Sequence, residues 1–365
     1  MPVLKPKALL ANRVEAVRSY HAKSGIKRAE LDVSGGIDSA VMAGVLVLAL
    51  GAENVTFAHL GINSNPVQTE RAKRLIDGIG AKLAVGDFTQ VYALIFSKVL
   101  EDLEDAGYDL AEIKDRIAKD PTILGSIRST LRAPLGRAFN RLTGGGIRHG
   151  TGNECEDRFL RFYQKGGDGE VDTNPVAMLS KAEIYQLAYA LADCFPEAKA
   201  AYYETIGAVP SADLWGVGDV HTDETEIKSW LGADFTYGRL DPDTGKVVNV
   251  GTIERVARFL DEVKLSDSLA TLLKGEPING YLLFGEDEPD WVTLATKAVD
   301  SQAFKDMHFK SLLEGLAYTT PLLRGARKAE RCTRHKWNPN CPALGTRKEL
   351  LDAGILSDNF ADYGI

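Results

Sequence analysis

The chain has 365 residues and a formal net charge of −8 at neutral pH, with 44% hydrophobic and 26% charged residues. This composition is typical of a chain with a packed core, while its acidity repels phosphate backbones and argues against general nucleic-acid binding. We expect no membrane span and a cytoplasmic location, because no long apolar run or leader-like N-terminus occurs and the four cysteines form no Cys-x-x-Cys pair.

The first part of the chain alternates between helical and strand patterns. In chain order we predict a helix at 8–23, a strand at 29–33, a helix at 39–50, a strand at 55–60, a helix at 68–79, a strand at 81–85 and a helix at about 88–104. Gly51 is placed as the residue that ends the third of these elements. The alternation predicts the α/β class, with a doubly wound, mostly parallel sheet.

The rest of the chain is predicted to be mainly helical. The expected elements are a polar helical stretch at 106–146, a poor strand at 147–149, a helix after the capping box of Ser180 and Glu183, and helices at 223–231, 252–263 and 266–274. We therefore divide the chain into an N-terminal helix (1–28), a main α/β domain (29–275) and a C-terminal helical extension packed on the core (276–365).

The turn after the first predicted strand reads Ser34-Gly35-Gly36-Ile37-Asp38-Ser39. Two glycines let the main chain approach an anion closely, and the following helix directs N–H groups and its positive dipole end toward that anion. Asp38 would repel phosphate unless a cation lay between them, so the motif also implies Mg²⁺. An ordinary strand–turn–helix connection is the alternative, but the complete hexapeptide in this position favours phosphate binding.

A second series of polar motifs follows, at 150–156, 165–175, 179–181, 210–214 and 222–224. Glu156 can complete a Mg²⁺ shell with Asp38, since Mg²⁺ prefers one or two carboxylates together with phosphates and waters. Lys181, at a predicted helix start, can neutralise phosphate charge. Any one of these residues could equally lie in an ordinary polar loop, but the whole series in this order favours a site.

The loop at 34–39 resembles the pyrophosphate loop of the N-type ATP pyrophosphatases, which cleave ATP to AMP and pyrophosphate. The later motifs resemble the NAD synthetase family within that group, with Gly-Thr-x-x-x-x-Glu, Gly-Asp-Gly-x-x-Asp-x-x-Pro, Leu-x-Lys and Pro-Ser-Ala-Asp-Leu in order over about 30–230. The resemblance implies a carbon–nitrogen ligase that uses ATP and ammonia to convert deamido-NAD to NAD through an acyl-adenylate. It also implies a homodimer. No glutaminase domain precedes the loop, so ammonia would come free or from a separate glutaminase.

The resemblance also assigns roles to individual residues. Asp38 and Lys181 would be catalytic, and Asp38 and Glu156 would hold Mg²⁺. ATP would be bound by Asp32, Val33, Ser34, Gly35, Gly36, Ile37, Asp38, Ser39, Thr151, Lys181 and Ser211. Deamido-NAD would be bound by Arg132, Lys165, Asp172, His308 and Lys310.

The sequence departs from the family pattern at 126–132, where Arg132 alone matches an arginine-rich motif. Three alternatives therefore stay open: a GMP-synthetase-like enzyme, a tRNA-modifying enzyme, and a nucleotide-binding protein without catalysis. Cys332, His335 and Cys341 offer three zinc ligands where a structural site needs four, so we interpret them as unrelated. Cys155 is interpreted as a packing residue, because no base lies beside it in the sequence.

Overall fold

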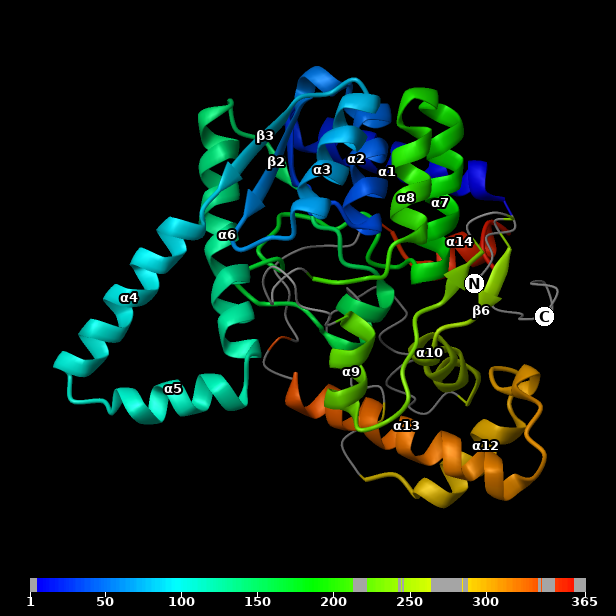
Figure 1. Cartoon of the computed structure of the whole chain (residues 1–365). Coiled ribbons are helices and arrows are strands. Elements are labelled where there is room, and N and C mark those ends of the chain that lie inside the picture. Colours follow the sequence, from blue (N-terminus) through cyan, green and yellow to red (C-terminus); the bar gives the residue numbers. More distant parts are fainter. Residues whose placement is uncertain are drawn as a thin grey trace.

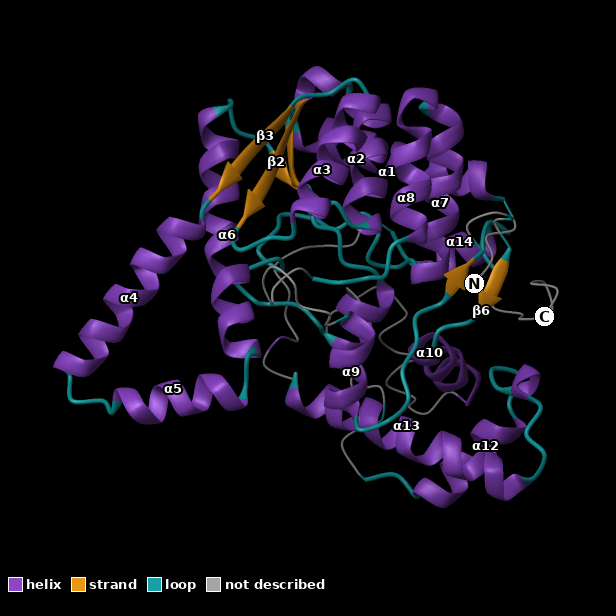
Figure 2. Ribbon diagram, in the orientation of Figure 1, coloured by secondary structure: helices purple, strands orange, loops and turns teal. Residues whose placement is uncertain are grey.

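The computed structural model describes residues 5–212, 222–241, 244, 246–263, 284, 288–333, 336 and 345–357. Four parallel strands form its main sheet in the order β3-β2-β1-β4 (Figures 1 and 2). Their bounds are Ala29–Asp32 for β1, Val55–Gly61 for β2, Leu83–Asp87 for β3 and Ile147–Arg148 for β4. The predicted α/β class with a doubly wound parallel sheet is confirmed. The segment expected to be a poor strand forms the two-residue β4.

Helices cover both faces of this sheet. On one side lie α1 (Pro6–Ser24), α2 (Ile37–Leu50), α3 (Pro66–Gly78), α7 (Lys181–Cys194) and α8 (Lys199–Gly207), with the short turns η1 (Ala52–Asn54) and η3 (Pro196–Ala198). Figure 1 shows α6 (Thr122–Leu142) on the other side, against β1 and β2. The first core lies between these layers and includes Leu9, Leu31, Val41 and Leu187, all fully buried. Apolar strands and one-sided apolar helices explain this arrangement.

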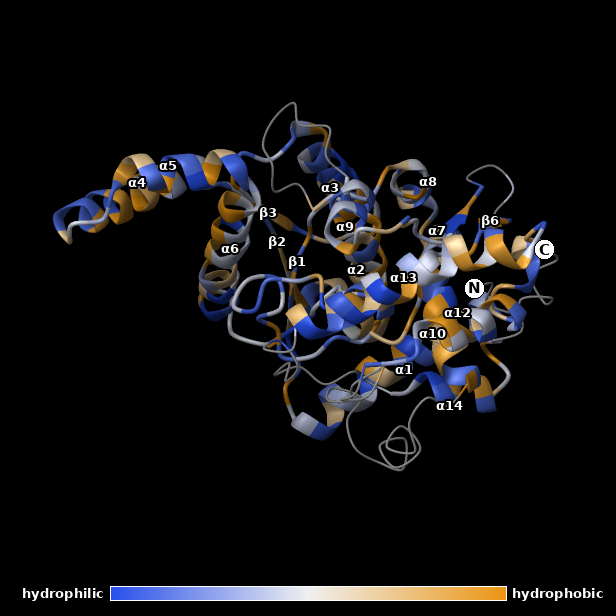
Figure 3. Cartoon of the chain, turned by 90° about the horizontal axis from the view of Figure 1, so that it is seen from below, coloured by the Kyte–Doolittle hydropathy of each residue, from blue (hydrophilic) through white to orange (hydrophobic). Residues whose placement is uncertain are grey.

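Helices α4 (Thr89–Asp105) and α5 (Leu110–Lys119) project away from the body of the molecule (Figures 1 and 3). Tyr92 is the buried residue of α4, and α5 has none. Several large apolar side chains of α4 are exposed, among them Leu94 at 71% and Val99 at 48%. An exposed apolar face of this kind marks a surface that another element or molecule covers.

The second core is formed by helices from the later part of the chain. These are α9 (Asp223–Leu231), α10 (Thr252–Val263), α12 (Trp291–Asp300) and α13 (Leu312–Cys332), with the π-helical turn η2 (Glu154–Leu160) and the turn η4 (Lys305–Met307). Buried members include Phe159, Ile227, Phe259 and Leu323. A small antiparallel ribbon of β5 (Arg239–Leu240) and β6 (Val247–Asn249) lies between the two cores, and α14 (Arg347–Asp352) returns to the first core through Leu350.

The predicted domain boundary at 275 and the predicted helix at 266–274 lie outside the described residues. The division of the chain into three domains therefore stays a prediction. Within the described ranges, no helix combines the length and the apolar character that crossing a membrane requires.

Candidate active site

The glycine loop follows β1 directly and leads into α2. The strand order changes direction at β1, because β2 lies on one side of it and β4 on the other. Ligands of open parallel sheets bind at this carboxyl edge. The Ser34 and Ser39 hydroxyls lie 3.1 Å apart, and Ser34 Oγ accepts from the Gly36 N–H at 3.2 Å. Ser39 Oγ donates to the Gly36 carbonyl at 3.0 Å. The loop is thus a compact turn whose following helix begins at Ile37, two residues earlier than predicted.

Gly35 is required by the geometry of this loop. Its φ is +87°, and a Cβ atom placed on it would lie 2.3 Å from the main-chain oxygen of Gln68 in α3. Arg71 of the same helix donates from Nη1 to the Gly35 carbonyl at 3.1 Å. A side chain at this position would therefore displace the loop from α3.

Asp38, Glu156 and Lys181 meet at the N-terminus of α2. Lys181 Nζ lies 2.7 Å from Asp38 Oδ2 and 3.0 Å from Glu156 Oε1, and its side chain is 2% exposed. Burial raises the pKa of Asp38, an effect that Lys181 opposes. Burial would lower the pKa of Lys181, but the two carboxylates outweigh it and hold that pKa well above its usual value. The lysine therefore remains a cation beside the loop.

Three further contacts fix this cluster. The Lys181 main-chain N–H donates to Glu254 Oε1 of α10 at 3.1 Å. Asn153 Nδ2 donates to Asp38 Oδ1 at 3.2 Å, while its own Oδ1 accepts from the Glu156 N–H at 3.2 Å. Elements from both cores thus converge on the cluster of Asp38, Glu156 and Lys181.

An open cavity with an empty volume of about 940 Å³ lies beside the cluster. Its walls include the predicted residues Ser34, Gly36, Ile37, Asp38, Ser39, Arg132, Thr151, Glu156, Lys181 and Ser211. Asp223, the first residue of α9, also lines it and accepts from the Ala212 N–H at 2.8 Å. Burial raises the pKa of Asp223 to about 7, because the effect of Lys181 only partly offsets the desolvation.

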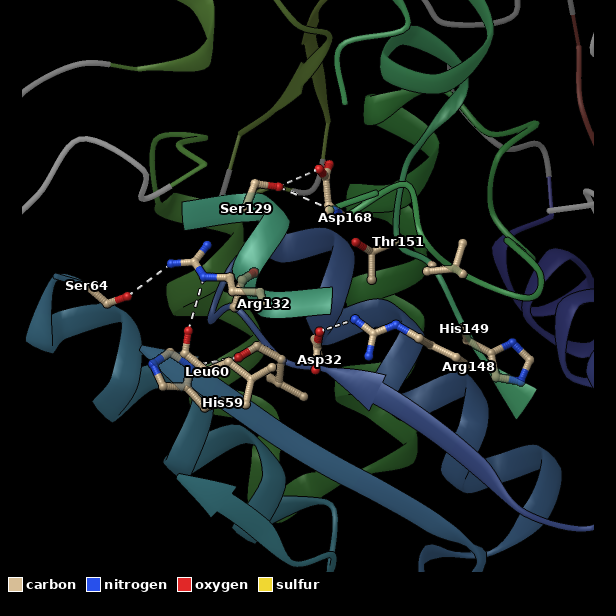
Figure 4. A pocket seen from close by; sticks show the side chains of 15 residues that line it. Asp32, His59, Leu60, Ser64, Ser129, Arg132, Arg148, His149, Thr151 and Asp168 are labelled. Atoms are coloured by element: carbon tan, nitrogen blue, oxygen red, sulfur yellow. Dashed lines mark hydrogen bonds and ion pairs between the residues drawn. The ribbon is translucent and has the colours of Figure 1, made fainter. Parts of the chain in front are cut away.

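A second cavity of about 750 Å³ adjoins the first at the carboxyl ends of β1 and β2 (Figure 4). The predicted residues Asp32, Val33, Ser34, Arg132 and Thr151 lie in its wall. Arg132 donates to the Leu60 carbonyl at 3.1 Å and to Ser64 Oγ at 3.3 Å. Arg132, which was expected to contact deamido-NAD, therefore lies in both cavities with the predicted ATP residues.

A buried charge group lies behind this second cavity. Arg148 of β4 pairs with Asp32, and its Nη1 lies 3.0 Å from both carboxylate oxygens of Glu30. Glu30 is fully buried, and burial together with the neighbouring Asp32 raises its pKa to about 9. Arg148 was not predicted as part of the site.

The NAD synthase family model matches residues 9–242, which is most of the described sheet and both cavities. The chain belongs to the NAD synthase family. The NH₃-dependent NAD⁺ synthetase of Methanosarcina acetivorans is 30% identical over 59% of this chain and 74% of that protein. The corresponding enzyme of Methanocaldococcus jannaschii is 31% identical over 57% and 69%, respectively. The NMN synthetase structure from Francisella tularensis matches with a TM-score of 0.49 and 23% identity, over 61% of this chain and 81% of that one.

Four predicted substrate residues of this NAD synthase family member lie outside both cavities: Lys165, Asp172, His308 and Lys310. Asp172 pairs with both terminal nitrogens of Arg137 on α6, each at 2.9 Å. Lys165 is exposed, and His308 ends η4 with a φ of 48°. The structure does not bring these residues to the Lys181 cluster, so their roles stay predictions.

The predicted magnesium ligands fit a small hard cation. Asp38 and Glu156 both offer hard carboxylate oxygens, and both line the cavity beside the phosphate loop. Among the described residues, no group of three or more His, Cys, Asp or Glu side chains is arranged to hold a metal. Two carboxylates suffice for Mg²⁺ where phosphates and waters complete the shell. Cys155 is buried in the second core, as expected for packing; His335 and Cys341 are not described.

Proposed function

We propose that this chain converts deamido-NAD to NAD, using ATP and ammonia and releasing AMP and pyrophosphate. One observation carries the proposal beyond family membership: the Lys181 ammonium lies against Asp38, at the start of α2 and beside the Ser34–Ser39 loop. A buried cation next to a helix N-terminus suits two phosphates that must separate. The same carboxyl edge holds a second cavity, whose wall includes Asp32, Val33 and Thr151.

The reaction proceeds in two displacement steps. A carboxylate oxygen of the nicotinate ring attacks the α-phosphorus of ATP, and the bond to the oxygen bridging the α- and β-phosphorus breaks with release of pyrophosphate. Ammonia then attacks the carbonyl carbon of the acyl-adenylate. The carbon–oxygen bond to AMP breaks, and the nitrogen loses a proton to leave the amide.

The loop and Lys181 stabilise the charge that develops on pyrophosphate in the first step. The N–H groups at the start of α2 and the Ser34 and Ser39 hydroxyls supply donors. Lys181 is prepositioned between its carboxylates, so little reorganisation is required when the phosphates separate. We assign the second cavity, lined by Asp32 and Thr151, to the nucleoside of ATP.

Mg²⁺ would be held by Asp38 and Glu156. When bound, the ion neutralises phosphate charge and orients the triphosphate. Both carboxylates line the cavity beside the phosphate loop, which supports this assignment.

The deamido-NAD site is proposed from the motif residues Lys165, Asp172, His308 and Lys310, together with Arg132. Ammonia arrives free or from a separate glutaminase. We propose the cytoplasm as the compartment, because the described cysteines Cys155, Cys194 and Cys332 are all free thiols.

A homodimer is proposed on the basis of α4. Val91, Leu94, Ile95 and Val99 are between 39% and 71% exposed, and they recur at three- and four-residue spacings. They therefore lie along one face of a helix that projects from the body (Figure 3). A second copy, presenting the same face, would cover this apolar stripe in a two-fold symmetric contact.

The test supplies ATP, Mg²⁺, ammonium and deamido-NAD and measures NAD and pyrophosphate in the same reaction. We expect equal amounts of both products, with deamido-NAD preferred over nicotinate mononucleotide, which carries the same carboxylate. Pyrophosphate without NAD would indicate another acceptor. The absence of both products, although ATP binds, would contradict the proposal and favour a protein that binds nucleotide without catalysis.

Asp38→Ala provides the internal control for this assay. Loss of the carboxylate removes one proposed metal ligand and one partner of Lys181. NAD formation should fall by about 100-fold or more, in line with the loss of one preorganised charged group. Full activity of Asp38→Ala would refute the proposed metal site.

A further inference from the structure

Tyr237 contacts two members of the proposed catalytic cluster from the segment between α9 and β5. Its hydroxyl donates to Glu156 Oε1 at 3.0 Å, and Lys181 Nζ lies 4.8 Å from the centre of its ring. The residue is 1% exposed, so both contacts are shielded from water. We propose that Tyr237 is a positioning residue that holds Glu156 and Lys181 in the arrangement needed to bind the metal–ATP complex. This inference rests on the proposed function, because it assigns Glu156 to the metal.

The Tyr237 hydroxyl determines which oxygen of Glu156 remains available to bind a metal ion. Tyr237 and Lys181 both contact Oε1 of Glu156. Neither of these two contacts involves the other carboxylate oxygen of Glu156, Oε2. Fixing one oxygen orients the carboxylate plane and leaves the other free as a ligand, which is how hydrogen-bonded partners behind metal ligands act.

The aromatic ring of Tyr237 acts on Lys181. A cation within about 6 Å of a ring centre is attracted to the ring face, and the attraction strengthens where water is excluded. The ring therefore favours the charged ammonium at the position between its carboxylates.

Tyr237 is itself fixed by contacts outside the proposed site. Its N–H donates to Glu224 Oε1 at 2.9 Å, and its carbonyl accepts from Asn249 Nδ2 at 2.8 Å. Phe235 of the second core packs edge-on against its ring, with centroids 5.0 Å apart. Packing of the second core thus determines the position of a side chain that touches Lys181 and Glu156.

The test is Tyr237→Phe, which removes the hydroxyl and keeps the ring. Mn²⁺ serves as the metal probe and is titrated by electron paramagnetic resonance, with an ATP analogue carrying a methylene group between the α- and β-phosphorus. We expect Mn²⁺ affinity to fall on the order of 10- to 100-fold, as for other partners of metal ligands. The KM for ATP at saturating metal should change less than twofold.

Tyr202→Phe is the matched control. Tyr202 is fully buried and its hydroxyl donates to the Ala40 carbonyl at 3.3 Å, within the first core. Its loss should leave Mn²⁺ affinity unchanged, whatever it does to stability. Wild-type Mn²⁺ affinity in Tyr237→Phe would overturn the inference.

A double-mutant cycle with Glu156→Gln decides the matter even where Tyr237→Phe weakens folding. If Tyr237 acts through Glu156, the loss of Mn²⁺ affinity in the double variant should be smaller than the product of the two single losses. Independent, multiplicative losses would contradict the inference. Because metal binding is measured without deamido-NAD, this outcome is separate from a failure of the wild-type chain to make NAD.

Discussion

Replacing Lys181 by methionine removes the ammonium that lies between Asp38 and Glu156 while keeping an unbranched chain against the Tyr237 ring. Both carboxylate oxygens lie within 3.0 Å of Nζ, so they are at most twice that distance apart. At about 6 Å and an effective dielectric constant of about 20, two like charges repel by about 3 kcal/mol. This agrees with the lower end of the cost of removing one partner from a buried ion pair, about 3–5 kcal/mol.

The loss of stability caused by Lys181→Met should increase with pH. Without Lys181, the neighbouring Glu156 charge raises the pKa of Asp38 further, so the folded variant binds a proton more tightly than the unfolded chain does. Stability of the variant therefore increases as pH falls, by at most about 1.4 kcal/mol per pH unit for one proton. The difference from wild type should be largest at pH 8 and smallest near pH 5.

Urea unfolding at pH 5, 6.5 and 8 measures the stability effect, and pyrophosphate release measures catalysis. We expect kcat to fall on the order of 100- to 1,000-fold. Lys199→Met is the control, because that lysine also lies over a tyrosine ring but is 48% exposed and 4.0 Å from its carboxylate partner. Its change in stability should stay below about 0.5 kcal/mol. A pH-independent loss in Lys181→Met would refute the proposed repulsion.

Three further changes test other parts of the molecule. Gly35→Ala should abolish ATP binding in calorimetry, because its methyl group would lie 2.3 Å from a main-chain oxygen of α3. Gly145→Ala is the control, because Gly145 also has a positive φ, of +74°, but faces open space, so this variant shows the effect of backbone strain alone. Arg148→Met leaves the side chains of Glu30 and Asp32 in β1 without their shared partner, so urea unfolding should show a loss of about 3–5 kcal/mol. Leu94→Glu should convert the proposed dimer to monomer in sedimentation, whereas Leu142→Glu, at an 87% exposed position, should not.

The sheet and its loop could be predicted because short-range patterns specify them. The glycine turn directly after a strand, with a helix behind it, has few other solutions in an α/β fold. Asp38 and Lys181 are 143 residues apart, yet the loops after parallel strands meet at one edge, and the two side chains lie 2.7 Å apart. For predicting that Asp38 and Lys181 meet, their separation in the sequence therefore mattered less than their position relative to the ends of the strands.

The remaining features depend on contacts that no local pattern encodes. Tyr237 lies in a short connection before β5, and its approach to Lys181 depends on main-chain contacts with Glu224 of α9 and Asn249 of β6. Arg148 did leave a signal: Glu30, between the apolar residues Ala29 and Leu31, required a buried partner, and an arginine stood in the predicted strand at 147–149. The apolar stripe of α4 was visible as helix periodicity, but periodicity does not tell whether the body of the protein or a partner covers it.

Arg347, the first residue of α14, determines when during translation the site can be completed. Its guanidinium pairs with both carboxylate oxygens of Glu183, at 3.0 and 3.1 Å, and Glu183 closes the capping box at the start of α7. Ribosomes deliver residues in order, at about 5–20 per second, so the phosphate loop and Lys181 are synthesised well before Arg347 exists. During that interval the buried Glu183 lacks its cation. The helix that presents Lys181 is therefore completed late in translation, and a nascent chain stopped before residue 347 would carry a weakened site.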